Sequence, residues 1–203
     1  MNSKDLKALE HYVSNTEKEV ISTLKGLDID ALNKAANLIR KAEKNGNRVH
    51  VSGIGKPGHI AGYIASLLSS TGTPSYFLHG TEAVHGSCGQ LCKGDVVIFI
   101  SNSGETSEMK ATIQAIKNNE CDVIGVSGNK DSWLAKQSKV HLLAHVDEEG
   151  GPLNRAPRAS ILSETIVLQA LSTILQSHEN IDPKQYVKWH PGGSLGQLRE
   201  NEK

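Results

Sequence analysis

Short, uninterrupted apolar runs alternate with longer stretches of helical spacing along most of this chain, and that alternation restricts the folds it can adopt. The runs that we interpret as strands occupy residues 48–52, 75–78, 96–100, 122–126 and 140–144. Strands that are apolar on both faces are typical of a parallel sheet covered by helices on both sides. The sequence therefore predicts an α/β fold, a three-layer αβα sandwich built on a five-stranded parallel sheet.

Helices are expected between these strands and before the first of them. The stretches with apolar residues at helical spacing are 4–27, 30–45, 60–69, 109–116, 133–135 and 160–176. The first two lie ahead of the sheet, so we assign residues 1–46 as N-terminal helices and residues 47–203 as the main domain. Because a five-stranded sheet does not need them as cover, we expect their apolar faces to pack on the domain and to bury in an oligomer. Those faces carry Val20, Ile21, Leu24, Leu32 and Leu38.

The charge balance argues against two classes of partner. The 203 residues carry 22 basic and 22 acidic side chains, interspersed along the chain, so neither nucleic acid nor a membrane surface is expected as a main partner. No apolar stretch approaches the length of a membrane span, and the N-terminus lacks the apolar run of a secretory signal. Cys88, Cys92 and Cys121 form neither an even disulfide set nor a zinc-finger spacing. We therefore expect reduced thiols and a cytoplasmic location.

A hydroxyl-rich segment follows the third expected strand. Residues 101–108 read Ser-Asn-Ser-Gly-Glu-Thr-Ser-Glu and lead into the next helix. Unpaired N–H groups and the dipole at a helix N-terminus favour an anion, and ligands of α/β sheets bind beyond the carboxyl ends of the strands. Four hydroxyls and an Asn exceed what one cap needs, so the segment predicts an anion site. Simple N-capping by Ser103 is the alternative.

Two other strand ends carry glycines or charge. Residues 53–59, Gly-Ile-Gly-Lys-Pro-Gly-His, let the backbone approach a ligand beside Lys56, although a tight turn with a solvated Lys explains them nearly as well. Their spacing fits neither a dinucleotide fingerprint nor a Walker A loop. Residues 147–149, Asp-Glu-Glu, follow the last strand and offer either a candidate base or a solvated loop. Residues 189–196 contain Trp, His and Pro-Gly-Gly, which suggests a docked segment near the C-terminus.

Taken together, these segments resemble the sugar isomerase (SIS) domain family, and within it they are most similar to the arabinose-5-phosphate isomerases. The segments that carry the resemblance are 53–59, 70–75, 82–86, 101–108 and 190–196. Many members of the family append a pair of CBS modules after the last of these. A chain that ends at Lys203 resembles the SIS-only form, which lacks that pair.

The resemblance implies a set of site residues. The side chains on the family's catalytic positions are Lys56, Glu108, Glu149 and His190. The implied substrate and phosphate contacts are Gly55, Ser101, Asn102, Ser103, Thr106 and His85. His85 also falls on a residue at the mouth of the site, where inhibitory zinc binds in the family.

The same resemblance implies the chemistry. Aldose–ketose isomerisation moves a proton between two carbons through an enediolate, so it needs a base and a stabilising cation, and no cofactor. We expect Glu149 as the base, Lys56 as the cation and His190 in ring opening or proton shuttling. Glu108 is expected to orient Lys56. The implied ligand is a small sugar phosphate.

The chain departs from the family beside the expected site. Arg158 stands where the isomerases carry a hydroxyl residue, and Ser160 keeps a hydroxyl in register. Gly151 replaces a Cys, and Asn154 replaces a Gly. Arg158 is expected to bind phosphate bidentately alongside Ser160, or else to make a salt bridge at the helix start. These departures leave the identity of the sugar open.

Three functions remain open. The first is an isomerase of arabinose 5-phosphate, the second an isomerase of another phosphosugar such as hexulose 6-phosphate, and the third a non-catalytic phosphosugar-binding regulator. The four catalytic candidates argue against a regulator, and no helix-turn-helix segment for DNA is evident. SIS domains form dimers or dimers of dimers, so the resemblance implies a homotetramer in which His85 or His190 reaches across a subunit boundary.

Overall fold

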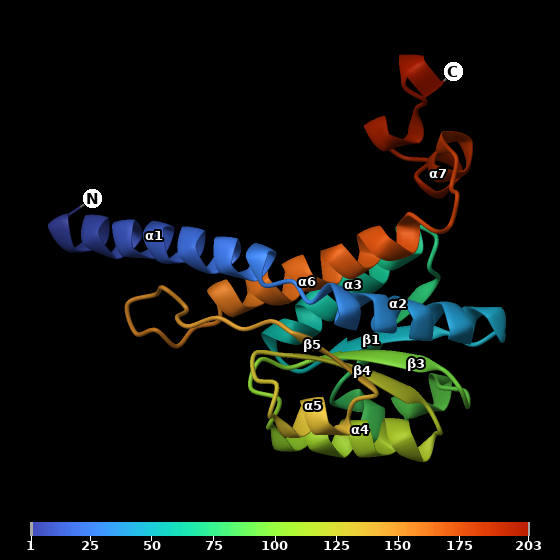
Figure 1. Ribbon diagram of the computed structural model, residues 1–203, viewed down its shortest axis with the longest axis horizontal. Helices are drawn as coiled ribbons and strands as arrows, with labels where there is room; N and C mark the ends of the chain where they lie inside the picture. Colours follow the sequence, from blue (N-terminus) through green and yellow to red (C-terminus); the bar gives the residue numbers. More distant parts are fainter. Residues whose placement is uncertain (1, 203) are drawn as a thin grey trace.

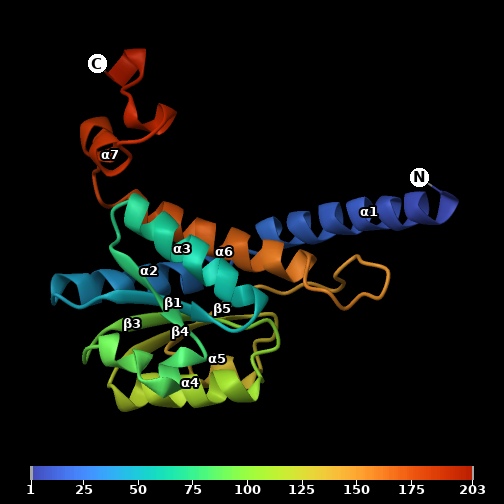
Figure 2. The same ribbon diagram turned by 180° about the vertical axis from the view of Figure 1, so that it is seen from behind.

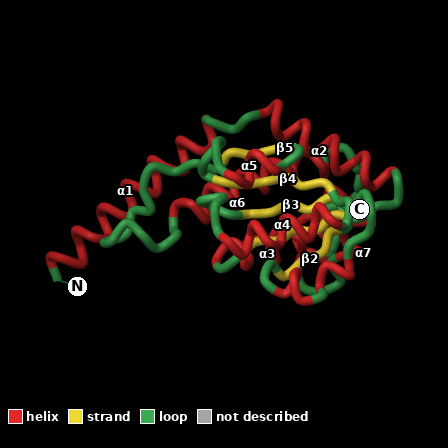
Figure 3. Tube along the Cα trace, turned by 90° about the horizontal axis from the view of Figure 1, so that it is seen from below, coloured by secondary structure: helices red, strands yellow, loops and turns green. Residues whose placement is uncertain are grey.

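The centre of the molecule is a five-stranded sheet, which the computed structural model describes together with the rest of residues 2–202. The strands are β1 (Val49–Gly53), β2 (Ser75–His79), β3 (Val96–Ile100), β4 (Asp122–Ser127) and β5 (Val140–Leu143). All neighbours are parallel, in the order β2-β1-β3-β4-β5. Figure 3 shows β5, β4 and β3 side by side, with β2 at the opposite edge from β5. The predicted parallel sheet is confirmed, and each strand lies within one residue of its expected bounds.

Helices cover both faces of this sheet and complete a three-layer sandwich (Figures 1 and 2). One face carries α2 (Ile29–Lys44), α3 (Lys56–Ser70) and α6 (Ala159–Gln176), and the other carries α4 (Ser107–Asn118) and α5 (Trp133–Gln137). Side chains alternate along the strands, so each face buries its own apolar cluster. Val51 and Ile98 pack with α2, α3 and α6, whereas Phe99 packs with α4 and α5. The predicted sandwich is confirmed.

The chain leaves the sheet in opposite directions after β1 and β3. β1 continues into α3 on one face, whereas β3 continues into α4 on the other. The two strands are neighbours, with Gly53 paired to Ile100 at their carboxyl ends. In an α/β sheet such a switch point opens a crevice that binds ligands, because two adjacent connections diverge there. The turns that follow β1 and β3 therefore lie at a position in the fold where ligands bind in α/β proteins.

The two N-terminal helices differ in their relation to the sheet. α2 buries Leu32 and Ile39, and Leu38 packs on the same cluster. The expectation that neither helix is needed as cover is wrong for α2, because this helix packs on β5. Leu32 and Leu38 therefore belong to the chain's own core. α1 (Ser3–Lys25) instead projects from the body beside α6, with Ile21 and Leu24 exposed (Figure 1).

α6 is the central helix of its layer, in contact with α1, α2 and α3. This helix has 18 residues and a mean hydropathy of 1.2, so by length and composition alone it could span a membrane. The expectation that no stretch approaches that length is therefore wrong. Half of this helix is buried inside the chain, and a helix packed among other elements is apolar for that reason. Within the described residues it is the one helix of this kind, which is weak evidence for a membrane span.

The C-terminal segment stands apart from the sandwich (Figure 1). It forms α7 (Pro183–Trp189), which the apolar pattern did not predict, although Asp182 followed by Pro is a typical helix start. The Asp182 side chain accepts a hydrogen bond from Gln185 N at 2.7 Å. No residue of α7 is buried, and residues 191–195 are exposed. Residues 191–195 of the segment that we expected to be docked are therefore not docked on their own chain, whereas Trp189 lines a hollow with Ser69 and Tyr76.

Candidate active site

A clamped turn follows β3 at the switch point. Gly104 has a left-handed backbone, with φ at +64°, and its carbonyl accepts a hydrogen bond from Leu134 N at 3.0 Å. A β-carbon at this position would lie 2.5 Å from Ser132 Oγ, so only glycine fits. Ser101 is buried, and its Oγ accepts a hydrogen bond from Gly104 N at 3.3 Å. Contacts with α5 and the hydroxyl of Ser101 thus fix the shape of this turn.

The helix start beyond this turn lacks a side-chain cap. Thr106 is the N-cap of α4, but its hydroxyl makes no capping hydrogen bond. Ser103 Oγ accepts a hydrogen bond from Glu105 N at 3.3 Å, so capping of α4 by Ser103 is wrong. Asn102 is exposed, and its backbone carbonyl accepts a hydrogen bond from Gly128 N at 2.9 Å. Backbone N–H groups and hydroxyls at the start of α4 are therefore open to an anion such as phosphate.

The turn after β1 places a second helix start at the same switch point, next to the turn after β3. Gly55 is the N-cap of α3, with φ at +68°, and Lys56 is the first residue of that helix. Lys56 is exposed and makes no ion pair with any residue in the described range. Its charge is therefore available to a bound anion.

Glu108 lies in the first turn of α4. Its own backbone N–H donates to its carboxylate, as does the Ser107 hydroxyl at 3.0 Å, and both hold the pKa of this carboxyl below its usual range. The helix dipole also favours a negative charge here. Glu108 is therefore an anion at neutral pH, which suits it to orient a cation such as Lys56 rather than to donate a proton.

Glu149 caps α6 from the preceding loop with one carboxylate oxygen. Its Oε2 accepts hydrogen bonds from Arg158 N at 2.6 Å and from Ser160 N at 3.1 Å. The N-cap residue, Arg158, supplies no side-chain cap of its own. Glu149 Oε1 has no hydrogen-bond partner within residues 2–202. A half-buried carboxylate with one oxygen anchored and the other open suits the role of a base.

The family departures gather around this loop. The Arg158 side chain is exposed, makes no ion pair in the described chain and packs on Gly151, where a β-carbon would collide with Nη1. Asn154 has φ at +47°, a conformation that the glycine it replaces adopts freely. Ser160 is fully buried, and its Oγ has no partner among the described residues. Its backbone N–H, rather than its hydroxyl, thus contacts Glu149.

The two candidate histidines differ in their positions. His85 ends a 3₁₀ helix, Glu82–His85, that follows β2, and it is exposed. His190 follows α7, where Nδ1 lies 2.8 Å from Tyr186 O and the ring stacks on Tyr186 at 4.0 Å between centroids. α6 separates His190 from the Glu149 loop, and its 18 residues span about 27 Å. A single chain therefore gathers Lys56, Glu108 and Glu149 at one sheet edge and leaves His190 at the far end.

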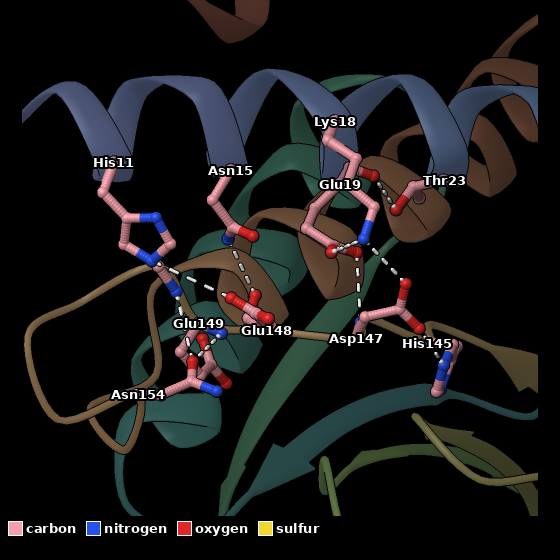
Figure 4. A network of polar contacts seen from close by, with 11 residues as sticks. His11, Asn15, Lys18, Glu19, Thr23, His145, Asp147, Glu148, Glu149 and Asn154 are labelled. Carbon is pink, nitrogen blue, oxygen red and sulfur yellow. Dashed lines mark hydrogen bonds and ion pairs between the residues drawn. The ribbon is translucent and has the colours of Figure 1, made fainter.

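Polar contacts from α1, which no sequence pattern predicted, hold the loop around Glu149 (Figure 4). Asn15 Nδ2 donates to Glu148 O at 3.0 Å, and Asp147 N donates to Glu19 Oε2 at 3.1 Å. The four-residue spacing of Asn15 and Glu19 puts both side chains on one stripe of the helix, but nothing in the sequence indicates that this stripe meets the loop around Glu149.

Comparison with known proteins identifies the family to which this fold belongs. The family model described as SIS domain matches residues 44–174, which is more than half of the chain. The chain belongs to the SIS domain family. The resemblance drawn from the glycine-rich and hydroxyl-rich segments is thereby confirmed.

Relatives within the SIS family carry names and a ligand. Arabinose 5-phosphate isomerase KdsD from Francisella tularensis subsp. tularensis is 38% identical over 180 residues, which cover 89% of this chain and 55% of that protein. The protein of the same name from Pseudomonas aeruginosa is 38% identical, with 89% and 54% covered. The structure of E. coli CFT073 c3406 in complex with arabinose 5-phosphate is 36% identical, with a TM-score of 0.82 and 94% and 100% covered. The chain spans about half the length of the curated relatives that it matches.

Proposed function

We propose that this SIS domain is an aldose–ketose isomerase that interconverts D-arabinose 5-phosphate and D-ribulose 5-phosphate. The observation that carries the proposal is Glu149, whose Oε1 is open, at the same sheet edge as two helix starts without side-chain caps. The names of the Francisella and Pseudomonas relatives support the substrate, as does the arabinose 5-phosphate complex of c3406.

The phosphate of the sugar binds at the start of α4, where the Ser101, Ser103 and Thr106 hydroxyls lie beside a helix N-terminus that Thr106 does not cap. Lys56 lies at the start of α3, after the neighbouring strand β1, and its charge stabilises the negative oxygen of the enediolate. Glu108 stays ionised, and although it makes no ion pair with Lys56 in residues 2–202, it orients Lys56 once the sugar phosphate is bound.

Glu149 carries the proton between carbons. It removes the proton from C2 of the open-chain aldose, the C–H electrons form a C1–C2 double bond, and the aldehyde oxygen takes the negative charge. Return of the proton to C1, with transfer of the O2 hydroxyl proton to O1, gives the ketose. The isomerisation is redox-neutral overall, so this chemistry requires no external oxidant or reductant.

The proposal includes a homotetramer, in which His190 of one copy completes the site of another. The distance that α6 imposes between His190 and Glu149 supports this assembly. Apolar side chains of α1 that are more than two-fifths exposed also support it, namely Leu6, Leu9, Val13, Ile21 and Leu24. Light scattering should report a tetramer, and a monomer at assay concentration would contradict the assembly.

Location and metal dependence complete the proposal. All three cysteines are free thiols, which supports a cytoplasmic location. No group of three or more His, Cys, Asp or Glu side chains in residues 2–202 forms a metal site. We propose that zinc acts as an inhibitor, and that it binds at His85. His85→Ala should then raise the zinc concentration that halves the rate, and an unchanged value would contradict that role.

An isomerase of another phosphosugar is the second candidate, because Arg158 and Gly151 alter the loop that carries Glu149. A turnover assay without added metal, on a panel of aldose and ketose phosphates, separates the candidates. We expect the highest kcat/KM for arabinose 5-phosphate. A preference for a hexulose phosphate would favour the second candidate. Absence of turnover, with retained phosphosugar binding, would favour a regulator.

A further inference from the structure

The face of α1 that packs on its own chain is polar, which is unusual for a buried helix face. Its buried residues in the described chain are Asn15, Glu19 and Thr23, with exposed fractions of 7%, 3% and 8%. Burying an amide or a carboxylate costs free energy unless specific hydrogen bonds compensate for the lost water. The partners of these side chains should therefore explain why the face is polar.

Two of the three side chains bind the loop that carries the candidate base (Figure 4). Asn15 Nδ2 donates to Glu148 O at 3.0 Å, and Glu19 Oε2 accepts from Asp147 N at 3.1 Å. Gly150 lies directly against α1, since a β-carbon there would meet Asn15 Nδ2 at 2.8 Å. Residues on both sides of Glu149 thus contact α1.

The opposite side of the loop fixes Glu149 itself. Asn154 Oδ1 accepts hydrogen bonds from Glu149 N at 2.6 Å and from Gly150 N at 3.3 Å. The carboxylate is anchored at the start of α6 through Oε2. The backbone that leads into Glu149, at residues 147 and 148, is the part of the loop that α1 holds.

We propose that Asn15 and Glu19 are positioning residues for Glu149, so that α1 sets where the base meets the substrate. The inference rests on the proposed isomerase function. Because a displacement of about 1 Å can lower a rate 10²-fold, loss of either contact should lower kcat. The phosphate site is built on α4 at the other face of the sheet, so KM should change little.

The test compares variants of one buried face. Asn15→Leu and Glu19→Ala remove the contacts with the loop, whereas Glu19→Gln keeps an oxygen that can accept from Asp147 N. Thr23→Val is the matched control, because Thr23 Oγ1 contacts the backbone carbonyl of Glu19 at 2.9 Å and Ser163 Oγ on α6 at 3.1 Å, and makes no contact with the loop. The assays are run at a temperature below the unfolding midpoint of every variant. Under these conditions we expect the kcat of Asn15→Leu and of Glu19→Ala to be roughly 10- to 100-fold below that of the wild type. Glu19→Gln should restore most of kcat, and Thr23→Val should lose stability without losing kcat.

A double-mutant cycle separates positioning from a general loss of packing. In a Glu149→Gln background, Asn15→Leu should cause no further loss of kcat, because its effect passes through Glu149. An equal loss in both backgrounds would overturn the inference, as would a comparable loss of kcat in Thr23→Val.

Hydrogen exchange provides a readout that does not depend on activity. Amides of residues 145–158 should exchange faster in Asn15→Leu than in Thr23→Val, and equal exchange would overturn the inference. An inactive wild-type chain with faster exchange in Asn15→Leu would instead contradict the isomerase function and leave the mechanical coupling standing.

Discussion

Arg158 packs on Gly151 so closely that a β-carbon at residue 151 would collide with Nη1 of the guanidinium. The backbone N–H of the same arginine donates to Glu149 Oε2 at 2.6 Å. Arg158 thus contacts the candidate base, Glu149, through its backbone, and it contacts Gly151 through its side chain. The two departures from the family pattern, at 151 and 158, form one structural unit beside the site.

Gly151→Cys should displace the Arg158 side chain without unfolding the chain, because the far end of an arginine moves easily. We expect the free energy of unfolding to fall by less than about 1 kcal/mol. KM across the phosphosugar panel should change as it does in Arg158→Thr, and the double variant should change no further. Urea unfolding and steady-state kinetics check this, and additive shifts in KM would contradict the coupling.

Gly104→Ala should destabilise the turn after β3, because residue 104 has φ at +64° and a β-carbon would lie against Ser132. We expect a loss of about 1–3 kcal/mol in the free energy of unfolding. Gly62→Ala is the control, since Gly62 lies inside α3 and a β-carbon there would meet nothing within 4 Å. It should gain about 0.5–1 kcal/mol. Equal effects of the two substitutions on urea unfolding would contradict the account.

Replacing both Ser103 and Thr106 with Ala should raise KM for phosphorylated substrates. The Thr106 hydroxyl makes no capping hydrogen bond, so its loss should leave the thermal midpoint nearly unchanged. Thr173→Ala, on the exposed surface of α6, serves as the control and should leave KM unchanged. An unchanged KM in the double variant would remove this loop from the phosphate site.

Glu164 predicts a pH dependence of stability. It is fully buried on α6, and neither carboxylate oxygen has a hydrogen-bond partner in the described chain. Burial, and to a lesser extent the charge of Glu149, raise its pKa from 4.5 to about 8. At pH values between 4.5 and about 8, Glu164 therefore keeps its proton in the folded state and has released it in the unfolded state. The free energy of unfolding should therefore fall as pH rises through this window, by at most about 1.4 kcal/mol per unit.

Glu164→Gln should flatten that decline, because glutamine does not titrate. Some decline should remain, since burial also raises the pKa of Glu43 to about 7. Urea unfolding of both proteins at several pH values between 5 and 8 measures the two slopes. Identical slopes would show that Glu164 does not retain its proton in the folded state.

The sheet could be predicted from the sequence because its strands are apolar on both faces. Residues 96–100 form a continuous apolar run, and they are β3 to the residue. α7 escaped prediction because its seven residues bury nothing, so no apolar period marks it. The oligomer interface predicted for Leu32 is wrong because apolar spacing does not tell a helix buried in its own core from one buried in a partner.

The candidate site was predictable in part. Lys56, Glu108 and Glu149 follow strand ends, and parallel strands bring their carboxyl ends to one edge. The contacts of Asn15 and Glu19 join residues more than 120 positions apart, and nothing in local spacing indicates that such distant segments meet. His190 carries a family signature, yet its place beyond α6 depends on the path of the tail rather than on any local pattern.

Proton transfer by Glu149 is the central claim, and deuterium incorporation tests it most directly. Wild-type protein incubated with arabinose 5-phosphate in D₂O should form ribulose 5-phosphate, with exchange of the carbon-bound proton followed by NMR. Glu149→Gln should slow both conversion and exchange by a factor of about 10² to 10⁴, with phosphosugar binding retained. Wild-type rates of conversion and exchange in Glu149→Gln would contradict the account.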